Sequence, residues 1–178
     1  MRASWQTKLQ LSGSLFKQTR MKLPMIKVRR VNHIVLWVRD LERMTNFYSS
    51  LLGLEVAERL GEDAVFLRVP DSDNHHDLGL IQLGPDAADT PEAPHTGLYH
   101  VAWEVASPQD LRDARDALTE ASVLVGESEH GNSLSLYAKD PEGNEFEIFW
   151  MIPRENWNDR EFGVRPLDLT AEMSRFPK

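Results

Sequence analysis

The stretch GLYHVAWEV, residues 97–105, places His100 inside an apolar run that is typical of a buried β-strand. A second stretch, RVNHIVLWV at residues 30–38, places His33 in the same setting. A lone histidine on a strand is more often a packed residue than a metal ligand. Two histidines in matching surroundings justify a search for a third ligand and for an internal repeat.

Each of these two strands opens the same order of predicted elements. Residues 31–38 precede a helix that lies between its N-cap Asp40 and Gly53. Residues 98–105 precede a helix that begins after its N-cap Ser107. Three strands follow each helix, at residues 54–60, 64–70 and 77–83 in the first half and 123–128, 134–140 and 146–150 in the second. A period of about 67 residues therefore predicts a duplicated βαβββ module and the α+β fold class.

The charge distribution sets the N-terminus apart from this repeat, since residues 1–30 contain eight Lys or Arg and no Asp or Glu. The predicted organisation is a basic arm at 1–24, a domain at 25–153 with modules at about 30–83 and 96–150, and a C-terminal extension at 154–178. The basic segment lacks the apolar core of a secretory signal. We interpret it as a flexible arm or an upstream start, with an organelle transit peptide as the alternative. We expect the extension to be an extended arm or a partner contact.

The composition excludes several classes of function. The net charge of −8 argues against a nucleic-acid partner, and no apolar run approaches the roughly 20 residues of a membrane helix. The chain has no cysteine, which excludes disulfides, thiolate ligands and cysteine nucleophiles and fits the cytoplasm. We therefore expect a small-molecule substrate, and any metal must be held by His, Asp or Glu.

Aligning the last strands of the two halves places Gly79 opposite Glu147, a carboxylate inside the apolar run FEIFW. Burying an unpaired carboxylate costs several kcal/mol, so Glu147 needs a cation, a proton or strong hydrogen-bond donors. An Arg or Lys partner is one explanation. The other is a metal site formed by His33, His100 and Glu147, a set that leaves octahedral positions free for substrate and dioxygen. Gly79 has no side chain and so supplies no fourth ligand. The alternative is that it is simply a glycine tolerated in an edge strand, without any relation to a metal.

The stretches NHIVLWVRDLERMTNFYSSLLGLE, YHVAWEV and DPEGNEFEIFW resemble the vicinal oxygen chelate superfamily. This superfamily includes glyoxalase I, antibiotic-resistance proteins and type I extradiol ring-cleavage dioxygenases, and the resemblance covers about residues 30–153. It implies that the two βαβββ modules form a shared open barrel around the metal site. The stretches NHHDLGL and EHGNSLSLYAKDPEGNEFEIFW are most similar to the extradiol dioxygenases.

This resemblance implies roles for three further residues, with His76 as an acid/base beside the metal and with His130 and Tyr137 as hydrogen-bond donors. It also implies an Fe(II) cofactor, for which Mn(II) could substitute, a catechol-type aromatic diol and O2 as substrates, and a homo-oligomer. Trp37 shares strand parity with His33 and is expected to line the barrel beside the metal. The alternative roles are a solvated turn for His76 and simple strand packing for Tyr137.

Two other functions stay open at this point. A metal-dependent transferase, lyase or epimerase of the same superfamily would use similar ligands. A non-catalytic drug-binding protein would not need the metal at all, which agrees poorly with three filled ligand positions.

Overall fold

The computed structural model describes residues 25–91, 94–158 and 160–176, so the predicted basic arm at 1–24 lies outside the described residues. The chain divides into two units, residues 1–31 and residues 32–178. The described part of the first unit, residues 25–31, forms neither helix nor strand. The second unit contains every element described below. None of the helices in the described ranges has the length and apolarity that a membrane span requires.

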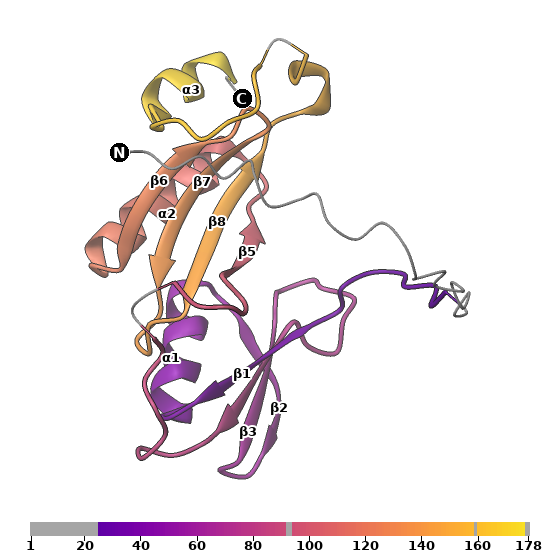
Figure 1. Ribbon diagram of the computed structural model, residues 1–178, viewed down its shortest axis with the longest axis vertical. Helices are drawn as coiled ribbons and strands as arrows, with labels where there is room; N and C mark the ends of the chain where they lie inside the picture. The colour runs from indigo at the N-terminus through magenta and orange to yellow at the C-terminus, as the bar shows by residue number, and fades with distance from the viewer. Residues whose placement is uncertain (1–24, 92–93, 159, 177–178) are drawn as a thin grey trace, which may run out of the picture. The chain divides into compact units, whose positions relative to one another are not determined.

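The second unit repeats one order of elements, as Figure 1 shows from indigo to yellow. The first module consists of β1 (Ile34–Val38), α1 (Leu41–Leu51), β2 (Glu55–Leu60), β3 (Ala64–Arg68) and β4 (Leu78–Gln82). The second consists of β5 (His100–Glu104), α2 (Pro108–Glu120), β6 (Leu124–Glu129), β7 (Ser133–Lys139) and β8 (Glu145–Met151). A short 3-10 helix η1 (Arg154–Asn156) and a helix α3 (Leu169–Arg175) follow. The α+β class and the duplicated βαβββ order are confirmed.

Each module forms its own four-stranded sheet, with the order β1-β4-β3-β2 in sheet A and β5-β8-β7-β6 in sheet B. The first strand of each sheet pairs in parallel with the last, and the other pairs are antiparallel. Val35 pairs with Gly79 in sheet A, and Ala102 pairs with Glu147 in sheet B. Gly79 and Glu147 therefore hold equivalent register positions, which confirms the alignment of the two halves.

The two long helices begin where their caps predict. The Asp40 carboxylate accepts a hydrogen bond from the backbone N–H of Arg43, and the Ser107 hydroxyl accepts one from the N–H of Asp110. Each cap satisfies a backbone donor that has no partner inside the helix. Gly53 follows α1 with a φ of 71°, a left-handed conformation that glycine adopts without strain.

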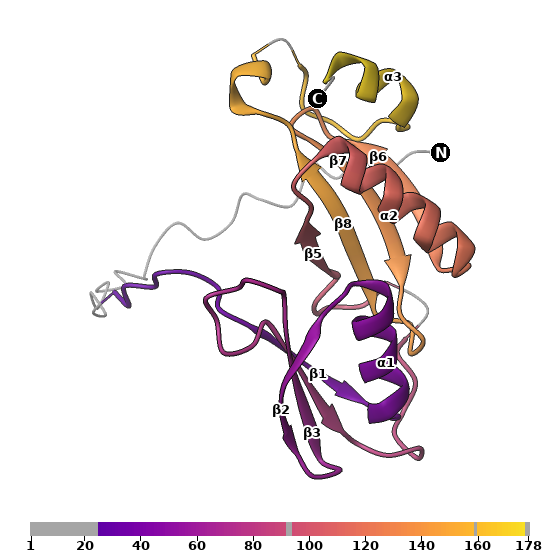
Figure 2. The same ribbon diagram turned by 180° about the vertical axis from the view of Figure 1, so that it is seen from behind.

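One face of each sheet packs on a helix and the other does not; we call the uncovered faces the open faces. Alternate strand residues such as Leu78 and Leu80 are buried with α1, while Phe146 and Ile148 are buried on the helix side of sheet B. Figure 2 shows α2 lying across sheet B. On the open face of sheet A, Trp37 remains 63% exposed. The open faces are therefore where side chains remain available for a site.

The turn between β7 and β8 joins the two modules. The Glu142 carboxylate accepts hydrogen bonds of 2.9 Å from the backbone N–H groups of Arg39 and Asp40, just before α1. The Tyr48 hydroxyl of α1 donates to Asp140 over 2.9 Å. Both side chains are buried, and burial raises the pKa of Tyr48 and of Asp140. Their hydrogen bond therefore connects the two modules in the interior of the protein.

The described part of the C-terminal extension packs on sheet B and is not an extended arm, while the alternative expectation, a partner contact, stays a prediction. Helix α3 begins after Asp168, whose carboxylate accepts from the N–H of Ala171, and it packs Leu169, Met173 and Phe176 against the core of sheet B. The spacing of these three apolar residues gives α3 one buried stripe.

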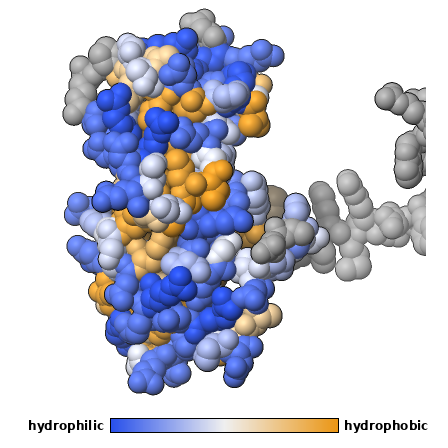
Figure 3. All heavy atoms as spheres, turned by 90° about the vertical axis from the view of Figure 1, so that its left-hand side faces the viewer, coloured by the Kyte–Doolittle hydropathy of each residue, from blue (hydrophilic) through white to orange (hydrophobic). Residues whose placement is uncertain are grey.

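Polar side chains dominate the face drawn in Figure 3, where hydrophobic ones gather near its middle.

Candidate metal centre

His100 and Glu147 meet on the open face of sheet B. His100 is the first residue of β5 and Glu147 is the third residue of β8, which pairs with β5. The His100 Nε2 atom lies 3.1 Å from Glu147 Oε2, and Glu147 is only 8% exposed. Its ion-pair partner among the described residues is this histidine, so the Arg or Lys explanation for the buried carboxylate is not supported.

Tyr137 and His130 extend this pair into a row of polar groups. Tyr137 is directly opposite Glu147 in the β7–β8 ladder, and its hydroxyl lies 3.4 Å from Glu147 Oε1 and 2.8 Å from His130 Nε2. Burial, followed by the Glu147 charge, raises the pKa of Tyr137 to about 12. The phenol therefore stays protonated at neutral pH and remains able to donate a hydrogen bond.

His33 and His76 meet in the other module. His33 immediately precedes β1, its Nδ1 atom lies 2.9 Å from Asn32 Oδ1, and its ring centroid lies 4.5 Å from that of His76. The ring of His76 also lies 4.8 Å from that of Phe66, the strand partner of Gly79. Burial, then the charges of His33 and His75, lowers the pKa of His76, which favours a neutral imidazole that can accept a proton.

The turn before β4 brings His76 to this position. His76 precedes the strand, so strand parity does not limit the direction of its side chain. The turn is held by Asp77, whose carboxylate accepts hydrogen bonds from Asn74, Ser72 and the backbone N–H of Val69. Asn74 also donates to the carbonyl of Asn32 over 2.9 Å, a link that our sequence analysis missed. The only sequence signal for this link is that an asparagine precedes a histidine in both stretches, Asn32 in NHI and Asn74 in NHH.

Gly79 leaves the position equivalent to Glu147 without a side chain. A Cβ atom built on Gly79 would lie 3.3 Å from Val35 Cγ2 and 3.5 Å from the Phe66 ring. A Cβ atom there would require only a small shift of the Val35 methyl group, and its contact with the Phe66 ring would be of ordinary length. Of the predicted ligands, His33 lies beside sheet A, whereas His100 and Glu147 lie on sheet B.

The structure brings the candidate residues together in two groups rather than one. His100, Glu147, Tyr137 and His130 lie on sheet B, whereas His33 and His76 lie beside sheet A. Across the described ranges, no group of three or more His, Asp or Glu side chains could hold a metal ion.

The chemistry of the donor set nevertheless fits a divalent metal. Neutral imidazole and carboxylate are the ligands that Fe(II), Mn(II) and Zn(II) accept. His100 Nδ1 is buried and, in the described part of the chain, has no hydrogen-bond partner. Glu147 contacts the His100 imidazole and the Tyr137 hydroxyl, and a bound cation would add the positive charge that a buried carboxylate needs.

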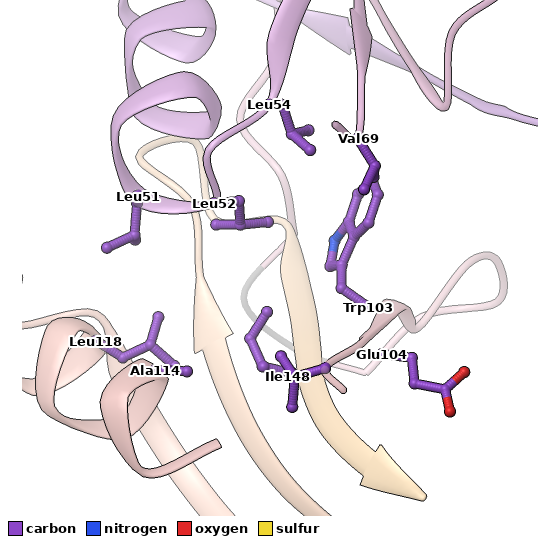
Figure 4. Close-up of a pocket in the computed structure, with 10 residues that line it drawn as sticks. Leu51, Leu52, Leu54, Val69, Trp103, Glu104, Ala114, Leu118 and Ile148 are labelled. Carbon is purple, nitrogen blue, oxygen red and sulfur yellow. The ribbon is translucent and has the colours of Figure 1, made fainter. Parts of the chain in front are cut away.

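Two cavities lie near these elements. One of about 870 Å³ is lined by Val35, Trp37, Tyr99 and Glu145 together with core residues such as Phe146. The other, of about 190 Å³, is apolar and is lined in part by Leu52, Trp103, Leu118 and Ile148, as Figure 4 shows. None of the proposed ligands lines either cavity, so the candidate site rests on the side-chain contacts on the open faces, such as that of His100 with Glu147, and not on a cavity.

Comparison with known proteins gives a family for this fold. The model of the Glyoxalase/Bleomycin resistance protein/Dioxygenase superfamily matches residues 30–148, and the chain belongs to this superfamily. The catechol-2,3-dioxygenase of Bacillus subtilis (strain 168) is 32% identical over 132 residues, which cover 74% of this chain and 45% of that protein. The chain thus spans less than half the length of this relative.

Other members of the superfamily with different activities are also similar to this chain. The ethylmalonyl-CoA/methylmalonyl-CoA epimerase of Cereibacter sphaeroides is 32% identical over 130 residues, covering 65% of this chain and 93% of that protein. A crystal structure of a glyoxalase/dioxygenase from Nostoc punctiforme matches with a TM-score of 0.58 at 20% identity, over 74% of this chain and 99% of that one. The family is therefore shown, and the fold agrees with it.

Proposed function

We propose that this protein is a metal-dependent extradiol dioxygenase that cleaves a catechol-type aromatic diol with O2. The observation that carries the proposal is the contact between half-buried His100 and buried Glu147, with Tyr137 and His130 in a row beside it. The similarity to a catechol-2,3-dioxygenase supports the same reaction class.

In this proposal His33, His100 and Glu147 hold the metal, Fe(II) with Mn(II) as a substitute, because neither ligand type selects between these ions. When bound, the metal would supply a Lewis acid toward the two hydroxyl oxygens of the diol. Gly79 keeps the fourth equivalent position free of a protein ligand.

The remaining candidates act on protons. His76 is the base that accepts a hydroxyl proton of the diol, because its lowered pKa keeps the ring neutral at pH 7. Tyr137 is a donor, because its raised pKa keeps the phenol protonated. His130 orients that hydroxyl through the 2.8 Å contact with Tyr137 and donates to the substrate or to developing negative charge.

We further propose that a second copy of the chain completes the ligand set. Sheet A of one protomer would face sheet B of its partner, so that His33 of one chain joins His100 and Glu147 of the other. The barrel would then form between two chains, whereas the family resemblance implies a barrel formed by the two modules of one chain. The exposed open-face residues Trp37 and Tyr99, 63% and 72% accessible, would be covered by such contact. The argument is that each sheet carries an incomplete part of one ligand set.

The test is anaerobic loading of the full-length protein with Fe(II), addition of catechol, and then admission of air. A coloured ring-opened product with one O2 consumed per diol is expected, together with one metal per chain. His100→Ala and Glu147→Gln should lose both metal and product. Full metal content in His100→Ala would remove the ligand assignment, and loaded wild type without turnover on a panel of diols would reject the activity.

The second candidate function is an acyl-thioester epimerase, favoured by the match over nearly the whole epimerase relative. Exchange of the substrate's α-proton with solvent deuterium, without O2 consumption, would identify this reaction. The missing acidic side chain at Gly79 and the Tyr137–His130 pair are our reasons to prefer the dioxygenase.

A further inference from the structure

The C-terminal segment 161–165 is hydrogen-bonded to the loop that contains His130. Glu129 and Arg165 form an antiparallel bridge, with backbone hydrogen bonds of 2.8 Å from Glu129 N to Arg165 O and 3.0 Å in the reverse direction. Gly163 donates to the carbonyl of His130 over 3.4 Å. This segment therefore extends the edge of sheet B beyond β6 at the residue before His130.

Side chains strengthen the same contact. The Glu129 carboxylate accepts from Arg165 Nε at 2.6 Å, from Arg160 Nη2 at 3.1 Å and from the backbone N–H of Gly131 at 2.8 Å. Glu129 is only 8% exposed. Hydrogen bonds to a buried carboxylate from two guanidinium groups are strong, and removal of one leaves an undercompensated charge.

The residue after His130 is also fixed by this segment. Gly131 has a φ of 88°, and a Cβ atom built on it would lie 2.5 Å from the carbonyl oxygen of Glu161. Only glycine permits both this backbone conformation and this approach. His130 is thus held from both sides, at Glu129 and at Gly131, by one segment of the C-terminal extension.

We propose that Glu129 and Arg165 are positioning residues that hold the His130 imidazole against the Tyr137 hydroxyl. The proposal rests on the proposed function, since it assigns a use to the 2.8 Å contact between His130 Nε2 and Tyr137. Without these contacts the loop could move, and the His130 imidazole would lose its contact with the Tyr137 hydroxyl. Displacement of a catalytic group by about 1 Å can lower the rate about 100-fold. The C-terminal extension then acts on the site through His130.

The matched test compares Arg165→Gln with Arg175→Gln. Arg175 belongs to the same ionic group, pairing with Glu172 at 2.7 Å, but it lies at the end remote from His130. The first readout is the imidazole spectrum of His130 in ¹⁵N-labelled full-length protein freed of paramagnetic metal, assigned by the signal that His130→Asn lacks. Arg165→Gln should shift or broaden this signal, whereas Arg175→Gln should not.

The second readout is kcat for diol cleavage. Arg165→Gln should lower kcat about 10- to 100-fold with a smaller change in KM, and it should add no further loss in a His130→Ala background. A merely structural role predicts losses that multiply. Should Arg165→Gln fail to fold, Gly131→Ala provides the second variant, since its methyl group must push the segment away from the loop.

The two readouts separate this proposal from the proposed function. A His130 signal unchanged in Arg165→Gln, equal shifts in Arg175→Gln, or multiplicative losses with His130→Ala would overturn the positioning role. Wild type without diol cleavage would reject the dioxygenase, and the imidazole spectrum alone would then decide whether the segment positions His130.

Discussion

Mixing two variants that are each expected to be inactive, His33→Ala and Glu147→Ala, should restore metal binding and diol cleavage. The reason is geometric: Glu147 pairs with His100 on sheet B, whereas His33 lies with His76 beside sheet A. If the ligand set is completed between chains, a mixed dimer contains one site with both substitutions and one site with neither. Neither variant alone can form an intact site.

The expected recovery follows from this arrangement. Random exchange between equal amounts of the two variants makes about half of the dimers mixed, and each mixed dimer has one intact site of two, so about a quarter of the wild-type sites return. Metal content and kcat per chain should both reach about this fraction of wild type. A ligand set within one chain predicts no recovery at any ratio.

The assay is subunit exchange with differently tagged variants, followed by isolation of the doubly tagged species, metal analysis and the diol-cleavage assay. The isolated mixed dimers should have about half of the wild-type sites, against about a quarter in the unfractionated mixture. The matched control mixes His100→Ala with Glu147→Ala. Both changes lie on sheet B, so no combination of chains restores a site. Doubly tagged dimers without metal in the first mixture, or a monomeric wild type that binds one metal per chain, would refute the shared site.

Three further predictions follow from other residues. His76→Gln should keep its metal but lose roughly 10²- to 10⁴-fold in turnover, the range of a positioned proton carrier; near-wild-type turnover would remove His76 from the mechanism. Deletion of residues 1–24 should leave the melting temperature and turnover nearly unchanged, and a large loss of either would contradict our domain boundary. Burial would raise the pKa of Glu129, but hydrogen bonds from Arg165 and Arg160 lower it below its ordinary value. Its stabilisation is therefore present above the unfolded-state pKa of about 4.3 and is lost as pH falls, so urea melts should show a shallower acid loss in Glu129→Gln; an unchanged slope would contradict this.

The repeat made the fold predictable from the sequence. The caps Asp40 and Ser107 and the alternation within each strand are local signals, and the structure has the corresponding elements within a few residues. The equivalence of Gly79 and Glu147 needed only the period and the last strand of each half, and the β1–β4 and β5–β8 registers agree with it.

The relation between the modules could not be predicted in the same way. It depends on single tertiary contacts, such as the Glu142 carboxylate on the backbone N–H groups of Arg39 and Asp40, which leave no periodic pattern. The C-terminal extension was misread for the same reason. Arg160 and Arg165 resemble ordinary surface charges until Glu129 is seen between them.

The two sets of candidate side chains differ in the direction in which their surroundings shift proton affinity. Burial and neighbouring imidazoles lower the pKa of His76, while burial and a neighbouring carboxylate raise that of Tyr137 to about 12. One group is thereby kept as a proton acceptor and the other as a donor, the division that acid–base chemistry at neutral pH requires. Because the acceptor lies beside sheet A and the donor lies on sheet B, the proposed meeting of the two open faces would bring the proton-transfer groups and the metal ligands together in a single step. A lone protomer would then neither bind the metal nor complete the proton transfer, so catalysis would depend on the association of two chains.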